Sequence, residues 1–313
     1  MAIADPNLVP DFQRYAGLIE AALRPPLEFT PEAENANAIQ AERGAVYGRM
    51  LMAERGQAIA APPAEVERLI EVASHAASMA VVDREGHCRP VYRPLMVYSW
   101  MMAFRVAYET LPREQFGRWE EGLRAWADLL EARLGQIALP GAGMAMASDG
   151  PGVAEACWIA LALHAAGREL ARDAWTDLAA DVFGRLPHWQ RESGAFLAAG
   201  PGDNVETLAY HELVILHAAS SYAVQTENRG LAGCVARATA FHQQETEPNH
   251  ATAKPWGLFA FAWNQATRPM ADGLLHAANM QGGTTRGGTN RSGVSLMLLA
   301  DALYCIRLFK VSD

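Results

Sequence analysis

The architecture of this chain is easiest to recognise in Gly200-Pro-Gly-Asp-Asn-Val-Glu-Thr-Leu-Ala-Tyr-His-Glu-Leu-Val-Ile-Leu-His-Ala218. A polar approach rich in glycine and proline leads directly into an apolar segment with helical periodicity. On a helix, Glu206, Tyr210, Leu213 and His217 recur every three or four residues and therefore share one face. That face carries a carboxylate, a phenol and an imidazole where an ordinary core helix carries Leu and Ala. The stretch predicts a buried helix with polar groups near its start.

Helical periodicity dominates the whole sequence, and only 81–82 and 90–92 favour strand. Start and stop signals predict about twelve helices. They lie near 10–23, 32–55, 63–82, 94–110, 113–135, 152–167, 169–185, 205–225, 229–244, 256–264, 268–280 and 293–309. In the helix near 205–225, Asp203 and Glu206 have the spacing of a capping box.

The predicted helices fall into two alternating classes. One class follows long polar loops and is apolar almost all round; its members begin near Pro31, Pro94, Pro151, Val205, Pro255 and Gly293. The other class follows short turns and is amphipathic, as in 113–127. Six pairs of an inner and an outer helix predict an all-α fold, an (α/α)6 toroid formed by a single domain, 1–313. An open α-solenoid is the alternative, because the spacing of the pairs is uneven.

Composition excludes several partners. The chain has 313 residues, half of them hydrophobic, and a formal net charge of −9, which argues against nucleic acid and anionic membranes. The four cysteines have no metal-binding or disulfide spacing. The sequence shows neither a signal peptide nor an apolar run of membrane-spanning length. We expect a soluble, cytoplasmic protein; a homo-oligomer is compatible with the sequence.

The toroid hypothesis gathers the long loops at one rim, which makes their polar residues candidates for a substrate site. The second loop brings His87, Arg89, Tyr92 and Arg93 to the start of an inner helix. Two arginines beside the positive end of a helix dipole suit an anion. The alternative is a surface loop held by surface carboxylates.

The fourth loop leads into the stretch quoted above. Asn204 and Glu206 lie at the helix start, and Tyr210 and His211 lie one turn deeper. Two adjoining polar rings on an apolar helix favour a function for Tyr210 and His211. For Asn204 we expect a plain helix cap and for His217 a hydrogen-bonded core histidine, with substrate binding by Asn204 as the alternative.

The last two loops bring further candidates. His250 and Trp256 precede the apolar run 257–263, where an indole suits either a sugar platform or a core position. The glycine-rich segment 281–293 contains Arg291, a candidate for binding a carboxylate. The histidines show no HxH or HExxH spacing, so we expect neither a metal nor another cofactor.

With the helix pairs and loops placed, the chain resembles the six-hairpin toroid superfamily, which includes uronate polysaccharide lyases, glycoside hydrolases and terpenoid cyclases. The lyases combine Asn, His, Tyr and Arg at the inner rim. Asn204, Tyr210 and His211 match these types, with Arg89, Arg93 or Arg291 as the cation, whereas an adjacent Asn-His pair occurs only at Asn249-His250.

The resemblance implies metal-independent β-elimination on a uronate-containing saccharide. Tyr210, His211 and His250 are then the acid–base groups, and the other candidates bind substrate. One alternative is an acid–base isomerase, dehydratase or cyclase of an apolar, terpenoid-like substrate, suggested by Met and Trp residues of the inner helices. A second alternative is a non-enzymatic helical scaffold that binds a protein partner.

Overall fold

The computed structural model describes residues 8–23, 91–110, 112–139, 150–198, 204–246, 254–280, 284–285, 288–289 and 293–311. These residues form eleven α-helices, one short 3-10 helix and one antiparallel pairing of two-residue strands. The predicted all-α class is therefore confirmed for the described part of the chain. The helices predicted at 32–55 and 63–82 lie outside it.

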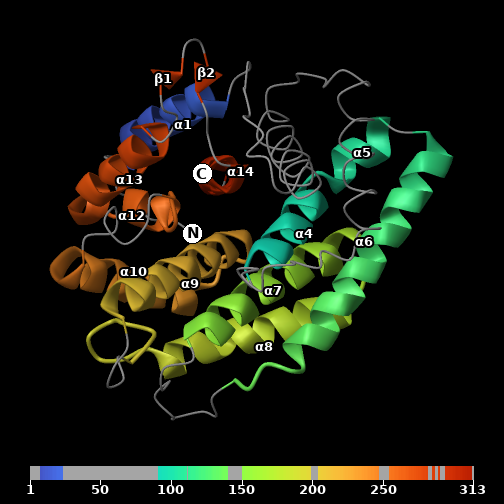
Figure 1. Cartoon of the computed structure of the whole chain (residues 1–313), viewed down its shortest axis with the longest axis horizontal. Coiled ribbons are helices and arrows are strands. Elements are labelled where there is room, and N and C mark those ends of the chain that lie inside the picture. The colour runs from blue at the N-terminus through green and yellow to red at the C-terminus, as the bar shows by residue number, and fades with distance from the viewer. Residues whose placement is uncertain are drawn as a thin grey trace. The chain divides into compact units, whose positions relative to one another are not determined.

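Figure 1 shows the helices in chain order. They are α1 (Leu8–Leu23), α4 (Tyr92–Met102), α5 (Phe104–Thr110), α6 (Arg113–Leu134), α7 (Gly150–Glu169), α8 (Asp173–Trp189), α9 (Val205–Gln225), α10 (Arg229–Glu245), α12 (Leu258–Trp263), α13 (Arg268–Met280) and α14 (Gly293–Val311). The 3-10 helix η2 (Gln265–Thr267) precedes α13, and β1 (Thr284–Thr285) pairs with β2 (Gly288–Thr289).

Two predicted helices have different bounds in the structure. The one predicted at 94–110 is divided at Ala103, whose N–H bonds to the carbonyl of Trp100 in a tightened turn. The one predicted at 169–185 begins at Asp173, because α7 continues to Glu169 and Ala171 then adopts φ 52°. It also continues past Pro187, which lies in its last turn.

The predicted alternation of helix classes is present in the described residues. Residues 153–167 of α7 and 212–223 of α9 are buried without interruption. By contrast, α6 buries one face only, made by Phe116, Trp119, Leu123, Trp126, Ala127, Leu130 and Leu134. A helix apolar all round is enclosed by other helices, whereas an amphipathic helix has one face in water.

The chain divides into two compact units. The first comprises Met1–Phe29, Ala138–Cys157 and Asp181–Asp313, and the second comprises Thr30–Ile137 and Trp158–Ala180. Helices α7 and α8 contribute residues to both units. The expectation that 1–313 form a single domain stays a prediction.

In the first unit α9 packs against α10, α12 and α14, and α12 packs against α13 (Figure 1). The two ends of the described chain also meet, because α1 packs against α14. Arg307 of α14 binds Glu20 of α1 at 2.9 Å, and Arg14 of α1 binds Asp272 of α13 at 2.7 Å. The ring of Phe12 stacks on that of Phe259, with centroids 6.2 Å apart.

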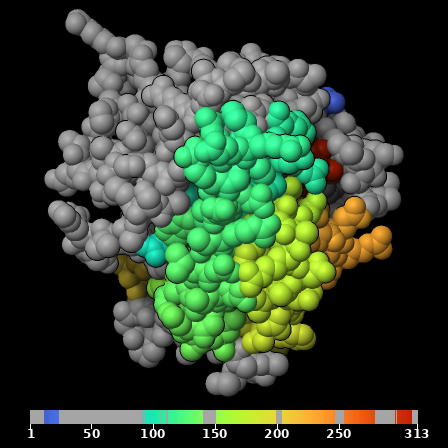
Figure 2. Space-filling model, turned by 90° about the vertical axis from the view of Figure 1, so that its right-hand side faces the viewer, coloured from blue at the N-terminus to red at the C-terminus, as the bar shows by residue number. Residues whose placement is uncertain are grey.

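The second unit packs α4, α5 and α6 together. The Phe104 ring contacts the rings of Phe116 and Trp119. Arg172 binds Asp128 at 2.6 Å and Glu131 at 3.2 Å, and the Trp175 indole N–H donates to Glu131 at 2.8 Å. These bonds fasten α6 to the start of α8, and Figure 2 shows the surface of α6 in green beside that of α8 in yellow-green.

A glycine pair tests the close approach at the turn from α7 to α8. A Cβ added at Gly167 would lie 2.7 Å from Thr176 Cγ2 and 2.9 Å from the carbonyl oxygen of Arg172, whereas one at Gly184 meets nothing within 4 Å. We expect Gly167→Ala to lower the free energy of unfolding by about 1–3 kcal/mol. Gly184→Ala should raise it by up to about 1 kcal/mol, because alanine favours a helix interior. Urea denaturation measures both; equal stability of the two variants would contradict the packing described.

Candidate functional site

The start of α9 is fixed by Asn204. Its side-chain oxygen accepts the backbone N–H groups of Glu206 at 2.9 Å and Thr207 at 3.2 Å, while its own backbone is extended. This is an N-cap, so the helix-cap expectation for Asn204 is confirmed. The predicted capping box from Asp203 is wrong, because the cap lies one residue later. Glu206 is exposed in the first turn, where the helix dipole favours a negative charge.

One turn deeper, two polar rings and an indole form an aromatic cluster. Tyr210 and His211 are both half-buried, and their ring centroids lie 5.6 Å apart in an edge-to-face arrangement. The Tyr210 ring also stands perpendicular to that of Trp256, with centroids 6.1 Å apart. Trp256 is completely buried. The structure therefore brings together three residues that the sequence analysis selected from two different loops; we call them the Tyr210–His211–Trp256 cluster.

The cluster contains a group able to accept a proton. Burial lowers the pKa of His211 below its ordinary value of 6.5. At neutral pH the imidazole is therefore uncharged and has a nitrogen lone pair available. A neutral imidazole beside a phenol supplies the two functions, base and acid, that proton-transfer chemistry requires.

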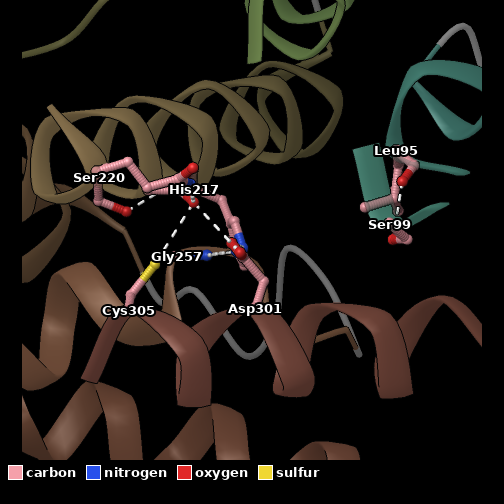
Figure 3. Close-up of polar contacts among 9 residues, drawn as sticks. Leu95, Ser99, His217, Ser220, Gly257, Asp301 and Cys305 are labelled. Carbon is pink, nitrogen blue, oxygen red and sulfur yellow. Dashed lines mark hydrogen bonds and ion pairs between the residues drawn. The ribbon is translucent and has the colours of Figure 1, made fainter. Parts of the chain in front are cut away.

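Beneath this cluster, His217 is held in one tautomer. The N–H of Gly257 donates to His217 Nδ1 at 3.1 Å, so Nδ1 carries no proton. The proton is then on Nε2, which donates to Asp301 Oδ2 at 2.9 Å (Figure 3). Both side chains are about 2% exposed or less. His217 is thus a core histidine with both ring nitrogens hydrogen-bonded, as expected.

Asp301 collects two donors from α9. Besides His217, it accepts the hydroxyl of Ser221 at 3.2 Å, and Ser221 in turn accepts from Gln225 at 2.9 Å and from the Cys305 thiol at 3.4 Å. Serine, histidine and aspartate here have the wrong order for nucleophilic catalysis, because the carboxylate lies between the other two. The network instead joins α9, α14 and the turn before α12.

Gly257 makes this junction possible. It adopts φ 74°, and an added Cβ would lie 3.2 Å from Phe261 Cε2. A left-handed conformation of this kind favours glycine. The residue before it is Trp256, whose ring lies 5.7 Å from that of His217 at 85°. His217 therefore fixes both the backbone and one ring edge at the base of the aromatic cluster.

A further buried carboxylate, Glu212, was not selected from the sequence. Its side chain accepts the backbone N–H groups of Phe196 at 3.0 Å and Leu197 at 2.5 Å. Burial raises the pKa of Glu212 to about 7 although these two hydrogen bonds, and nearby Arg191, act in the opposite direction. Asp301 was missed in the same way. The available signal was an acidic residue in the interior of a helix whose neighbouring positions are mostly apolar.

Of the remaining candidates, two belong to the second unit and four lie outside the described residues. Arg93 is exposed in α4 of the second unit, where its guanidinium lies 5.7 Å from the centre of the Trp126 ring. Tyr92 is the first residue of the same helix. The other four, His87, Arg89, His250 and Arg291, lie outside the described residues.

Comparison with protein-family models, with curated proteins and with solved structures finds no match for this chain. Within the described ranges, no group of three or more His, Cys, Asp or Glu side chains is placed to hold a metal ion. No helix in those ranges is both long and apolar enough to cross a membrane. Function must therefore be argued from the geometry around α9.

Substitution of Asp301 tests the buried network. Asp301→Ala leaves His217 Nε2–H and the Ser221 hydroxyl without their acceptor, and should lower the free energy of unfolding by about 2–4 kcal/mol. Asp301→Asn retains an oxygen for His217 and should cost less. Asp181→Ala breaks an exposed ion pair with Arg185 within α8 and should cost less than about 1 kcal/mol. Chemical denaturation ranks the three, and nitrogen NMR of His217 reports its tautomer; a protonated Nδ1 in the wild type would contradict the assignment.

Proposed function

We propose that this protein is a carbohydrate-active lyase that cleaves a uronate-containing saccharide by metal-independent β-elimination, with Tyr210 and His211 as its acid–base groups. One observation carries the proposal: a half-buried phenol and a half-buried imidazole adjoin each other above a buried indole. The type of substrate comes from the resemblance to toroid lyases. The chemical roles come from the arrangement of the rings.

In the proposed reaction, His211 removes the proton from C5 of the uronate. The electrons of the C5–H bond form a C4–C5 double bond, and the C4–O bond breaks. The Tyr210 hydroxyl gives its proton to the departing glycosidic oxygen. Burial supports the first step, because it keeps the His211 imidazole neutral and able to accept a proton. His250 is the alternative base.

Elimination also requires that the uronate carboxylate be neutralised, because its charge otherwise keeps the C5 proton weakly acidic. Arg291 or Arg89 is proposed for this role on sequence grounds. Asn204 is a further candidate: its oxygen caps α9, whereas the amide nitrogen, which is a donor, takes no part in that cap. Exposed Glu206 completes the proposed binding surface, whereas Trp256 is completely buried and takes the core position that the sequence left open for it.

We further propose that the helices form the closed (α/α)6 toroid. In an open solenoid the first and last helices lie at opposite ends and cannot touch, because each repeat contacts only its neighbours. Here α1 packs against α14, with the Glu20–Arg307 ion pair between them. This contact favours the ring over the solenoid and over a scaffold with an extended groove. A crystal structure in which the buried helices fail to enclose one cavity would contradict it.

The second candidate function is acid–base conversion of an apolar substrate. It is favoured by the completely buried Trp256 beside Tyr210 and by the buried rings of Phe259 and Phe261 in α12. These enclosed rings would not themselves touch a substrate; the Trp256 indole makes one side of Tyr210 apolar, which suits a terpenoid-like molecule. Tyr210 and His211 would serve as acid and base in either reaction. The two candidate functions are therefore distinguished by which class of substrate the protein converts.

A first experiment measures the new double bond. On a panel of uronate polysaccharides and oligosaccharides, we expect an enzyme-dependent rise in ultraviolet absorbance. Tyr210→Phe and His211→Ala should each lower kcat by at least about a hundredfold. Matched controls are Tyr108→Phe and His276→Ala, which change an exposed tyrosine and an exposed histidine. No rise on any uronan, or full activity in both site variants, would contradict the proposal.

The pH dependence tests the role of His211. A base must be unprotonated, and the pKa of His211 is lowered by burial, so activity should persist below pH 6.5 before it falls. We expect the acid limb of kcat/KM to lie below pH 6.5 in the wild type and in His276→Ala. An acid limb above that pH would assign the base to another group.

A further inference from the structure

A continuous series of contacts runs from the buried carboxylate of α14 to the phenol of Tyr210. Asp301 Oδ2 accepts the Nε2 proton of His217 at 2.9 Å, and the other ring nitrogen, Nδ1, accepts the backbone N–H of Gly257 at 3.1 Å (Figure 3). The peptide bond that carries this N–H joins Gly257 to Trp256. The Trp256 ring then stands at 85° to that of His217 and at 90° to that of Tyr210.

The backbone at Gly257 depends on a partner outside its own turn. Glycine adopts positive and negative φ almost equally well, so its φ of 74° is not imposed by the residue itself. Within the turn, Leu258 N–H reaches the carbonyl of Pro255 only at 3.3 Å. The bond to His217 Nδ1 is shorter and comes from the enclosed part of α9. It therefore fixes the direction of the chain at the point where Trp256 enters the core.

Neither His217 nor Trp256 is placed to touch a substrate. The His217 side chain is about 2% exposed, and Trp256 is completely buried. Of the residues in this series, Tyr210 is the one that is half-buried. Any effect of His217 on a reaction must therefore pass through Trp256 to the Tyr210 ring.

We propose that His217 is a positioning residue: by accepting the Gly257 N–H, it sets the Trp256 indole against which the acid Tyr210 packs. The role of Tyr210 as the acid rests on the proposed function, whereas the placement of its ring is a property of the folded protein alone. A general acid must lie within hydrogen-bond distance of the departing oxygen, so a small displacement of the phenol slows the reaction. Loss of the acceptor at His217 should thus lower kcat and leave KM nearly unchanged.

Two substitutions of His217 separate its two hydrogen bonds. An asparagine side chain ends at the position of Nδ1, so its oxygen accepts the Gly257 N–H but does not reach Asp301. A glutamine side chain ends at the position of Nε2, so its amide donates to Asp301 but leaves the Gly257 N–H without its acceptor. Both variants lose the imidazole and one buried hydrogen bond, so a general loss of stability affects them alike.

NMR of the Tyr210 ring measures its placement without a substrate. The Trp256 indole displaces the chemical shifts of the Tyr210 ring protons, and Tyr210→Phe assigns those signals. In His217→Gln we expect the shifts to change and the nuclear Overhauser contacts with Trp256 to weaken, whereas His217→Asn should retain both. Ser220→Ala is the matched control, because it removes a buried hydroxyl that donates to the backbone carbonyl of His217 at 2.9 Å and leaves the ring contacts in place.

Kinetics test the consequence for the reaction. With a substrate identified by the ultraviolet assay, His217→Gln should lower kcat at least about tenfold with KM within about twofold of the wild type, and His217→Asn should restore most of kcat. A loss confined to KM, or an equal loss of kcat in the two variants, would overturn the proposal. If no uronan is cleaved, that result counts against the proposed function, while the NMR comparison still decides whether His217 places Tyr210.

Three spectroscopic results would also overturn the proposal: unchanged Tyr210 signals in His217→Gln, equal changes in the two His217 variants, or changed signals in Ser220→Ala. If the His217 variants do not fold, the wild type supplies a second measurement. Nitrogen NMR should show a coupling across the hydrogen bond from Gly257 N–H to His217 Nδ1, together with the contact between the Tyr210 and Trp256 rings. Absence of either signal would contradict the proposed series of contacts.

Discussion

Helix α9 is enclosed over residues 212–223, so every polar side chain in that stretch must find its partner inside the protein. For His217 this partner is Asp301, whose Oδ2 accepts a hydrogen bond from His217 Nε2. A buried carboxylate or imidazole without a partner would cost several kcal/mol. Because Gly257 N–H occupies the other ring nitrogen, the same imidazole fixes the relative positions of α9, α14 and the turn that carries Trp256.

The aromatic cluster depends on this arrangement. Trp256 touches His217 on one side and Tyr210 on the other, in both cases nearly edge-on. The buried histidine therefore supports the indole, and the indole supports the phenol. Tyr210 and His211 gain a defined environment without themselves being enclosed. Both side chains are half-buried, with the Tyr210 hydroxyl oxygen itself buried, and burial keeps the His211 imidazole neutral.

Local sequence signals predicted the helices well, because their start and stop residues act over a few positions. The bounds 205–225 and 268–280 agree with α9 and α13. The same signals placed Tyr210 and His211 at the start of α9 and Trp256 before the next buried helix. They could not predict Asp301 or Glu212 as buried partners. Asp301 meets His217 from 84 residues away, and Glu212 meets backbone N–H groups that have no signature in the sequence. Asn204 was predicted as the helix cap and is confirmed, whereas the capping box from Asp203 was wrong; both residue types are good caps.

Tyr210, His211 and Glu212 are consecutive, yet they serve different purposes because a helix turns by about 100° at each residue. Tyr210 faces Trp256, and Glu212 faces the backbone N–H groups of Phe196 and Leu197. Burial favours the neutral form of both His211 and Glu212, and at Glu212 it acts against the two backbone N–H groups, which favour the charged form. One turn of helix thereby links the Tyr210–His211–Trp256 cluster to the backbone of residues 196–197, which precede it in the chain.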